Sequence, residues 1–309
     1  MPKDPYQWTK ERISYLIEKI ELVKNDGDVI SAGKIWSIKK LLALDYYIAS
    51  THAIFKKNFD YWYYVDTHCG SGVIGFEEDE LLKLERFPGS PLIAALRNEH
   101  NPFSDYFFSD IDKDTISVLN SRLKKLKDHV GNRDYSPVVK SFSNTAQEIK
   151  SNESWGKIFL VFIDPTGYSD LQWNDVKKLL SIDKADVFIT FMSYSIALNR
   201  PHARLGTEYE KTFDSVFGTS KWRGCSNQTE LLELYLTQIK TLKEYVEVIP
   251  IFRAGENKLY DLIFASSNPK GAGSIMGYIK KIMNNVTTEI IESAMKVVTK
   301  KELDLDKWV

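Results

Sequence analysis

YWYYVDTHCGSGVIG, residues 61 to 75, joins an aromatic and β-branched run to a glycine-rich turn. The run up to Asp66 predicts a buried β-strand. Gly70, Gly72 and Gly75 then spell G-x-G-x-x-G. In α/β proteins a glycine loop directly after a strand lets the backbone approach a bound cofactor. The stretch therefore predicts the first strand and the cofactor loop of a doubly wound sheet.

Further apolar runs follow this stretch, with helical patterns between them. Strands are expected over 106–110, 136–142, 158–164 and 186–192, and helices over 112–130 and 169–181. Near-continuous apolar runs are typical of parallel strands that helices cover on both faces. Residues 246–267 then predict an antiparallel hairpin around a turn at Gly255, Glu256 and Asn257. We therefore expect an α/β fold with a Rossmann-like, doubly wound, mostly parallel seven-stranded sheet that ends in an antiparallel hairpin.

Helical patterns on both sides of this region predict the domain organisation. Apolar residues at helical spacing over 8–24 and 34–57 predict an N-terminal helical arm, residues 1–58. The α/β domain is expected over 59–285, with a helical insertion over 193–245. Helices are also expected over 273–284 and 288–300, so that residues 286–309 form a C-terminal helix and tail.

The composition limits the kinds of partner and site. The chain has 43% hydrophobic residues and a formal charge of −1, so it can bury a large core but gives no bulk argument for nucleic-acid binding. Its two cysteines are far apart and no Cys/His cluster has metal-ligand spacing, so we expect no disulfide scaffold and no metal site. Neither a signal peptide nor a membrane span is expected, which predicts a cytoplasmic location.

Acidic residues around the glycine loop indicate which cofactor it holds. Four acids at 77–80 follow the third glycine, where a pyrophosphate would need positive charge. Asp66 precedes the loop and suits an amine, while Asp110 ends the next strand, where a carboxylate can bind ribose hydroxyls. Ribose and an amine without phosphate describe S-adenosylmethionine. Two alternatives stay open: Asp110 as the N-cap of the following helix, and a nicotinamide oxidoreductase, which Gly75 alone favours.

Several motifs together resemble a known family. YVDTHCGSG (64–72), FSDIDKD (108–114) and VFIDPTGY (161–168) are similar to motifs of class I S-adenosylmethionine-dependent methyltransferases. With FPGSPLIAAL (87–96) and LIFASSNPKGA (262–272), the ordered set resembles the three-Cys-motif partner proteins, TcmP, over roughly residues 34 to 285. The resemblance implies a methyltransferase acting on an amino group of a DNA or RNA base, and a partner protein that bears a three-cysteine motif.

The resemblance also implies roles for individual residues. The cofactor site would consist of Asp66, His68, Gly70, Gly72, Asp110 and Asn144, with Ser143 as an alternative to Asn144. Asp164 and Pro165 would orient the acceptor amine and Tyr168 would stack on its ring, as catalytic residues; the alternative for 164–168 is a tight turn. His68 replaces the first glycine of the family motif, the second proline is missing and the aromatic residue comes one place late. These departures favour a second interpretation, a catalytically inactive partner subunit.

Overall fold

A seven-stranded sheet forms the centre of the protein. The structure is a computed structural model that describes residues 4–77, 80, 82–97, 103–131, 135–255 and 257–300. The strands are β2 (Tyr61–Asp66), β5 (Asp105–Asp110), β6 (Val138–Val139), β7 (Lys157–Ile163), β8 (Ala185–Phe191), β9 (Tyr245–Phe252) and β10 (Lys258–Ser266). Their order is β6-β5-β2-β7-β8-β10-β9, with β10 antiparallel to both neighbours and the other pairs parallel. This order confirms the predicted fold class, that of class I methyltransferases.

The predicted first strand, β2, lies in the middle of the sheet. It pairs in parallel with β5 on one side and β7 on the other. Trp62 and Tyr64 pack into one buried cluster, whereas Val65 packs into the other and Tyr63 lies at its edge. Because both faces are covered, nearly every position of the strand can be apolar, which explains the unbroken run in the sequence.

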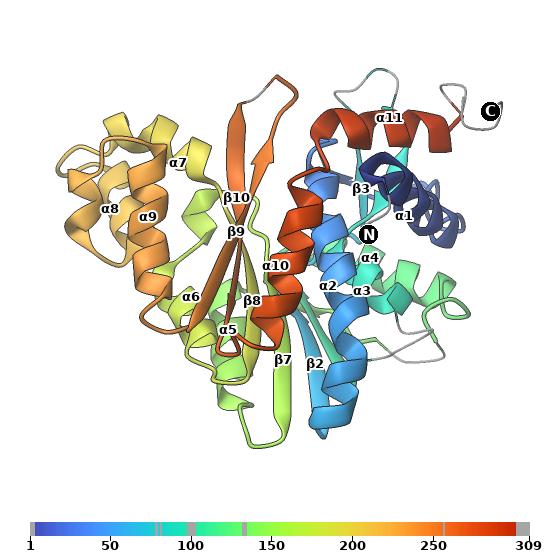
Figure 1. Ribbon diagram of the computed structural model, residues 1–309, viewed down its shortest axis with the longest axis horizontal. Coiled ribbons are helices and arrows are strands. Elements are labelled where there is room, and N and C mark those ends of the chain that lie inside the picture. The colour runs from blue at the N-terminus through green and yellow to red at the C-terminus, as the bar shows by residue number, and fades with distance from the viewer. Residues whose placement is uncertain are drawn as a thin grey trace.

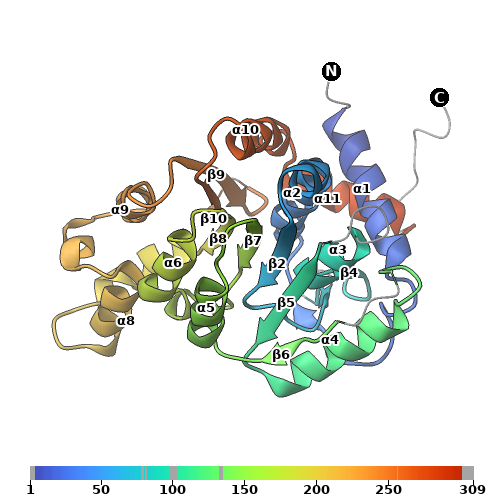
Figure 2. The ribbon, with the colours of Figure 1, turned by 90° about the horizontal axis from the view of Figure 1, so that it is seen from below.

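Helices cover both faces of the sheet (Figures 1 and 2). On one face are α2 (Ser37–Asn58), α3 (Ser90–Leu96), α4 (Lys113–Lys125) and α10 (Ala272–Met283). On the other are α5 (Phe142–Ser151), α6 (Trp173–Leu180), α8 (Glu208–Phe217) and α9 (Gln228–Ile239). The two layers therefore bury separate hydrophobic clusters.

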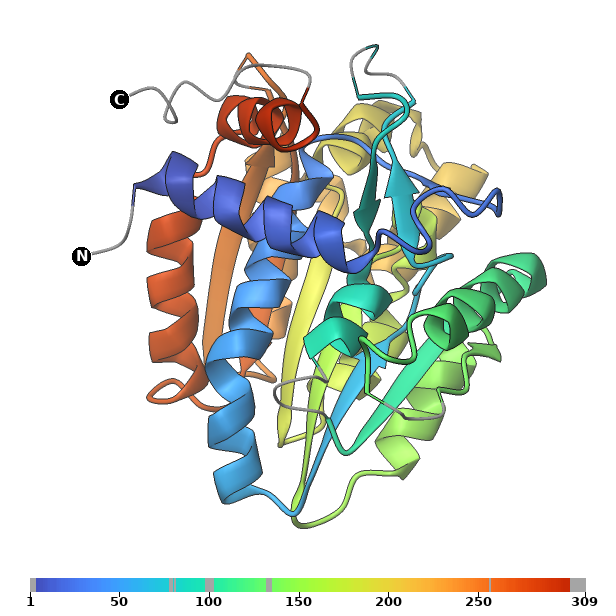
Figure 3. The same ribbon diagram turned by 90° about the vertical axis from the view of Figure 1, so that its right-hand side faces the viewer.

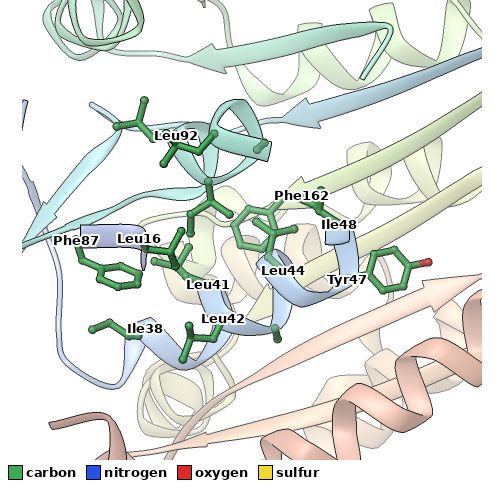
Figure 4. Close-up of a cluster of buried hydrophobic side chains, with 14 of the residues drawn as sticks. Leu16, Ile38, Leu41, Leu42, Leu44, Tyr47, Ile48, Phe87, Leu92 and Phe162 are labelled. Atoms are coloured by element: carbon green, nitrogen blue, oxygen red, sulfur yellow. The ribbon is translucent and has the colours of Figure 1, made fainter. Parts of the chain in front are cut away.

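Helix α2 is fixed in the core by its apolar side. Figure 4 shows Leu41 and Leu44 of α2 near Leu92 of α3, Phe87 and Phe162. The other N-terminal helix, α1 (Pro5–Lys19), packs against α11 (Thr288–Val298) outside these layers (Figure 3). How the chain divides into domains stays a prediction.

Several short elements were not expected from the sequence. These are β1 (Ser31–Ala32), β3 (Val73–Gly75) and β4 (Arg86–Pro88), which form a small sheet in which β3 directly follows the glycine loop. The short helix α7 (Ser193–Asn199) after β8 lies within the expected helical insertion. Strands of two or three residues are too short to show a period. Within the expected helical insertion over 193–245, α8 and α9 are separate helices, because Gly218 ends α8 with a φ of 61°. Glu256, in the expected hairpin turn, lies outside the described residues.

Candidate cofactor and acceptor site

A cavity of about 930 Å³ lies at the carboxyl edge of the parallel strands. Its walls come from the loops after β2, β5, β7 and β8, from the first turn of α2 and from β10. Among the predicted site residues, those that line the cavity are His68, Gly70, Gly72, Asp110, Asp164 and Pro165. Asp66, Asn144 and Tyr168 are outside the lining. The topology thus gathers six of the nine predicted residues at one cavity.

The glycine loop needs its first two glycines. Gly70 and Gly72 have φ values of 61° and 83°, in the left-handed region. A Cβ atom on Gly72 would lie 2.8 Å from Leu119 Cδ1 and 3.0 Å from Leu92 Cγ, so the loop packs closely against α4 and α3. Gly75 lies in β3, so the loop leads into a strand. A dinucleotide fingerprint opens a helix instead, and the third glycine therefore does not serve that motif here.

Arg122 of α4 holds the glycine loop through buried hydrogen bonds. Its guanidinium is fully buried and donates to the Ser71 carbonyl at 2.9 Å and to Ser71 Oγ at 3.0 Å. It also pairs with Asp26 at 2.9 Å. Burial acts to raise the pKa of Asp26, but Arg122, the Asp28 amide and Lys125 together lower it to about 2. Arg122 is thus a buried support of the loop, a role that the sequence did not indicate.

Asp110 faces the glycine loop. Asp110 Oδ2 accepts a hydrogen bond of 3.0 Å from the Gly70 amide, and Oδ1 accepts one from the Asp112 amide. The N-cap of α4 is Asp112, whose side chain accepts from the Thr115 amide at 2.7 Å. The N-cap alternative for Asp110 is therefore wrong, and its carboxylate lies at the cavity wall.

Asp66 lies beneath the cavity, fully buried. Its carboxylate accepts hydrogen bonds from the Tyr64 hydroxyl at 3.2 Å and from the His68 amide at 3.4 Å. Burial raises the pKa of Asp66 to about 7, although the hydrogen bonds from Ser90, Tyr64 and His68 act to lower it. Asp66 is therefore placed to hold the start of the loop.

The start of α5 forms another part of the cavity wall. The His68 ring lies 5.2 Å from the Phe142 ring, and burial lowers the pKa of His68. Ser143 lines the cavity and its hydroxyl donates to Asp175 at 3.1 Å. Asn144 is exposed, and its backbone amide donates to the hydroxyl of the N-cap residue Ser141. Of the two residues considered for the cofactor site, Ser143 is therefore the one at the cavity.

Asp164 is paired with a residue that sequence reasoning missed, Lys40 of α2. Lys40 Nζ lies 2.5 Å from Asp164 Oδ1 and 2.7 Å from Oδ2. The side chains are only 13% and 18% exposed, respectively. Burial acts to lower the pKa of Lys40, but Asp164, Tyr260 and Asp66 raise it above its usual value, so Lys40 is a cation. No motif marks Lys40; its one signal is that it interrupts an apolar helix.

The other two residues of the acceptor motif are placed differently from each other. Pro165 lines the cavity beside Asp164. Tyr168 begins a 3₁₀ turn, and its ring packs edge-on against Phe213 of α8, at 5.9 Å. Because this aromatic residue comes one place later than in the family motif, the Tyr168 ring contacts the helical insertion instead of the cavity. Among the described residues, the aromatic rings that line the cavity are those of Phe142, Tyr260 and His68.

The described residues contain no group of three or more side chains that could hold a metal ion. Both cysteines are free and buried, and burial raises the pKa of the Cys69 thiol well above its usual value. In the part of the chain that the structure describes, no helix has the length and apolar character needed to cross a membrane.

The fold and the cavity together define the class: an α/β protein of the class I methyltransferase fold with a cavity at its strand ends. No protein-family model matches the chain, and no curated protein sequence does. Structural similarity extends to a Legionella pneumophila protein of the DUF519 family, with 11% identity over 80% of this chain and 92% of that one, at a TM-score of 0.49. A Klebsiella pneumoniae protein described as a putative O-methyltransferase shares 8% identity over 87% and 92% of the two chains, at 0.40.

The plantazolicin methyltransferase BpumL is also similar, in a complex that contains SAH. It shares 13% identity over 84% of this chain and 99% of that one, at a TM-score of 0.37. The fold class follows from the strand order β6-β5-β2-β7-β8-β10-β9.

Proposed function

We propose that this protein is an S-adenosylmethionine-dependent methyltransferase that acts on an amino group of a nucleic-acid base. The observation that carries the proposal is that the glycine loop, Asp110 and Asp164 meet at one cavity. In an open α/β sheet, ligands bind outside the carboxyl ends of the strands. The motifs that resemble those of methyltransferases lie at these strand ends, which supports the proposal.

The proposed cofactor would lie between the glycine loop and the end of β5. Asp110 would bind the ribose hydroxyls and the backbone at 68–72 would contact the methionine part, since both line the cavity. Asp66, which is buried beneath the loop, would order this backbone through the His68 amide rather than contact the cofactor directly. Ser143 would take the place predicted for Asn144.

The chemistry requires alignment more than acid or base catalysis. Methyl transfer is an in-line displacement on a sulfonium, so correct positions of the two reacting atoms account for much of the acceleration. Asp164 and the Pro165 carbonyl would accept hydrogen bonds from the acceptor amine. Any stacking partner would be Phe142 or Tyr260, because Tyr168 is turned to the insertion.

Cofactor binding can be tested with a matched pair of carboxylates. In calorimetric titrations we expect wild type to bind S-adenosylmethionine. Asp110→Ala should bind it at least roughly tenfold more weakly, because a charged hydrogen bond of about 1.5–3 kcal/mol is lost. Asp114→Ala should bind it as wild type does. Asp114 is an exposed acid on the first turn of α4. No heat with wild type, or equal loss in both variants, would refute the cofactor assignment.

A second function has a specific observation in its favour. The Lys40 ammonium already contacts both oxygens of Asp164, and Tyr168 does not reach the cavity. An inactive subunit that binds a three-Cys-motif protein is therefore the alternative. Labelled S-adenosylmethionine with total cellular DNA or RNA, with and without a three-Cys-motif protein, separates the two. The enzyme is supported if wild type transfers the methyl group and Asp164→Ala still binds the cofactor but transfers nothing. The inactive subunit is supported if wild type binds the cofactor but transfers no methyl group, whether or not the three-Cys-motif protein is present.

A further inference from the structure

The Lys40–Asp164 ion pair has unused hydrogen-bonding capacity. An ammonium has three N–H donors, and Lys40 uses two on Asp164. Across the described residues the Lys40 side chain donates no other hydrogen bond, so one donor remains. A carboxylate has about four acceptor sites, so Asp164 also keeps free lone pairs. The pair therefore offers a donor directly beside an acceptor.

The backbone around the pair is firmly placed. Lys40 lies on α2, whose neighbouring side chains Ile38, Leu41 and Leu42 are buried in the core. Asp164 follows β7, an interior strand of the sheet. The Tyr260 ring centroid lies 5.6 Å from Lys40 Nζ, which adds a cation–π contact. Because both elements are fixed by packing, the donor and the acceptor keep a defined spacing.

A second buried polar group faces the same cavity. Thr190 of β8 lines it and is 1% exposed. Its hydroxyl has no hydrogen-bond partner among the described residues. A buried hydroxyl without a hydrogen-bond partner is unfavourable, and a polar ligand group at this place would supply the missing partner. The cavity is thus suited to a ligand with more than one polar atom.

We propose that Lys40 is a specificity-determining residue that recognises an amidine edge, an exocyclic amino group beside a ring nitrogen, as in adenine and cytosine. The amino group donates to Asp164 and the ring nitrogen accepts from the third N–H of Lys40. The inference rests on the proposed function and deepens it, because it specifies which side of the acceptor base faces the pair. Lys40 itself touches neither the methyl group nor the sulfonium and forms no bond in the transfer.

The experiment compares bases that differ only at the ring nitrogen. With the protein saturated by SAH, we would titrate adenosine against 1-deazaadenosine, and cytidine against 3-deazacytidine, by ligand-observed NMR. Wild type is expected to prefer the natural nucleoside in one of the two pairs by about tenfold, as for a charged hydrogen bond. The pair that shows the preference identifies the base.

Three variants isolate the role of Lys40. Lys40→Met is expected to lose the preference, and Lys40→Arg to restore it at least in part, because arginine keeps an N–H donor. Lys57→Met is the matched control, since it removes the same charge from an exposed position of α2. Unchanged SAH binding by each variant shows that the fold is intact.

The outcomes distinguish this inference from the proposed function. Equal binding of both members of each pair by wild type, or the wild-type preference retained in Lys40→Met, overturns the role of Lys40 while leaving the cofactor assignment in place. Failure of wild type to bind SAH overturns the proposed function and, with it, this inference.

Discussion

Two aspartates at neighbouring strand ends have different environments. Asp110 is partly exposed at the cavity wall, whereas Asp66 is fully buried beneath the loop. Desolvation disfavours a buried carboxylate, and here burial is the largest cause of a pKa near 7. Both acids end strands and precede turns in the sequence, so their difference depends on what packs above them.

Asp66 should make stability depend on pH. Its pKa rises from the ordinary value of 3.8 to about 7 in the native state, so between these values the native state holds a proton that the unfolded state has lost. The free energy of unfolding therefore falls as pH rises from about 4 to about 7, by on the order of 4 kcal/mol at most. Asp66→Asn stays neutral and should gain stability relative to wild type between pH 5 and pH 8.

Urea denaturation of wild type and Asp66→Asn at the two pH values measures this difference. Because it is a difference between two proteins, other titrating groups cancel to first order. An equal stability gap at pH 5 and pH 8 would contradict the raised pKa.

At the scale of elements, the glycine loop is held by packing against α3 and α4. Gly72 approaches Leu92 and Leu119, and Arg122 bonds to Ser71. The sequence predicted the loop because glycines after a strand are a local signal. It did not predict the buried role of Arg122, because Asp26, its ion-pair partner, is 96 residues away in the chain.

Gly72→Ala tests this packing, with Gly206→Ala as the control. Both glycines have positive φ, 83° and 81°, so each alanine costs about 1–2 kcal/mol of backbone strain. A Cβ on Gly206 meets nothing within 4 Å, whereas one on Gly72 would clash with two leucines. In Gly72→Ala the free energy of unfolding should fall by about a further 1–3 kcal/mol, and SAH binding should weaken.

Thermal denaturation and calorimetry measure both effects in the two glycine variants. If Gly72→Ala matches Gly206→Ala in stability and binds SAH as wild type does, the loop is not constrained by α3 and α4.

At the scale of the molecule, the cavity unites distant parts of the chain. Its walls include Ser37 of α2, Asp110 at the end of β5, Asp164 after β7 and Tyr260 of β10. A ligand that binds only the folded state stabilises it, by about 2.7 kcal/mol at one hundred times Kd. SAH should therefore raise the Tm of wild type by a few degrees in a single transition, and raise that of Asp110→Ala much less at the same concentration.

Differential scanning calorimetry over a series of SAH concentrations provides the measurement. The same Tm increase in wild type and Asp110→Ala would show that SAH stabilises the protein elsewhere than at this cavity.

The sequence by itself determined the order of the main strands and helices and the acidic residues at the strand ends. It could do so because burial on both faces, helical periodicity and glycine turns leave local patterns. The small sheet around β3 was too short for such a pattern. Asn144 and Tyr168 were expected at the site, yet the direction of each side chain depends on the turn that carries it.

Only the tertiary structure decided which charges meet. Lys40 and Asp164 are 124 residues apart in the chain, and neither residue carries a signal of the other. The packing of α2 on the sheet brings them into contact, because its apolar side enters the core and leaves Lys40 at the cavity. Local patterns specify elements, whereas the chemistry of this site arises from side chains that long-range packing brings together.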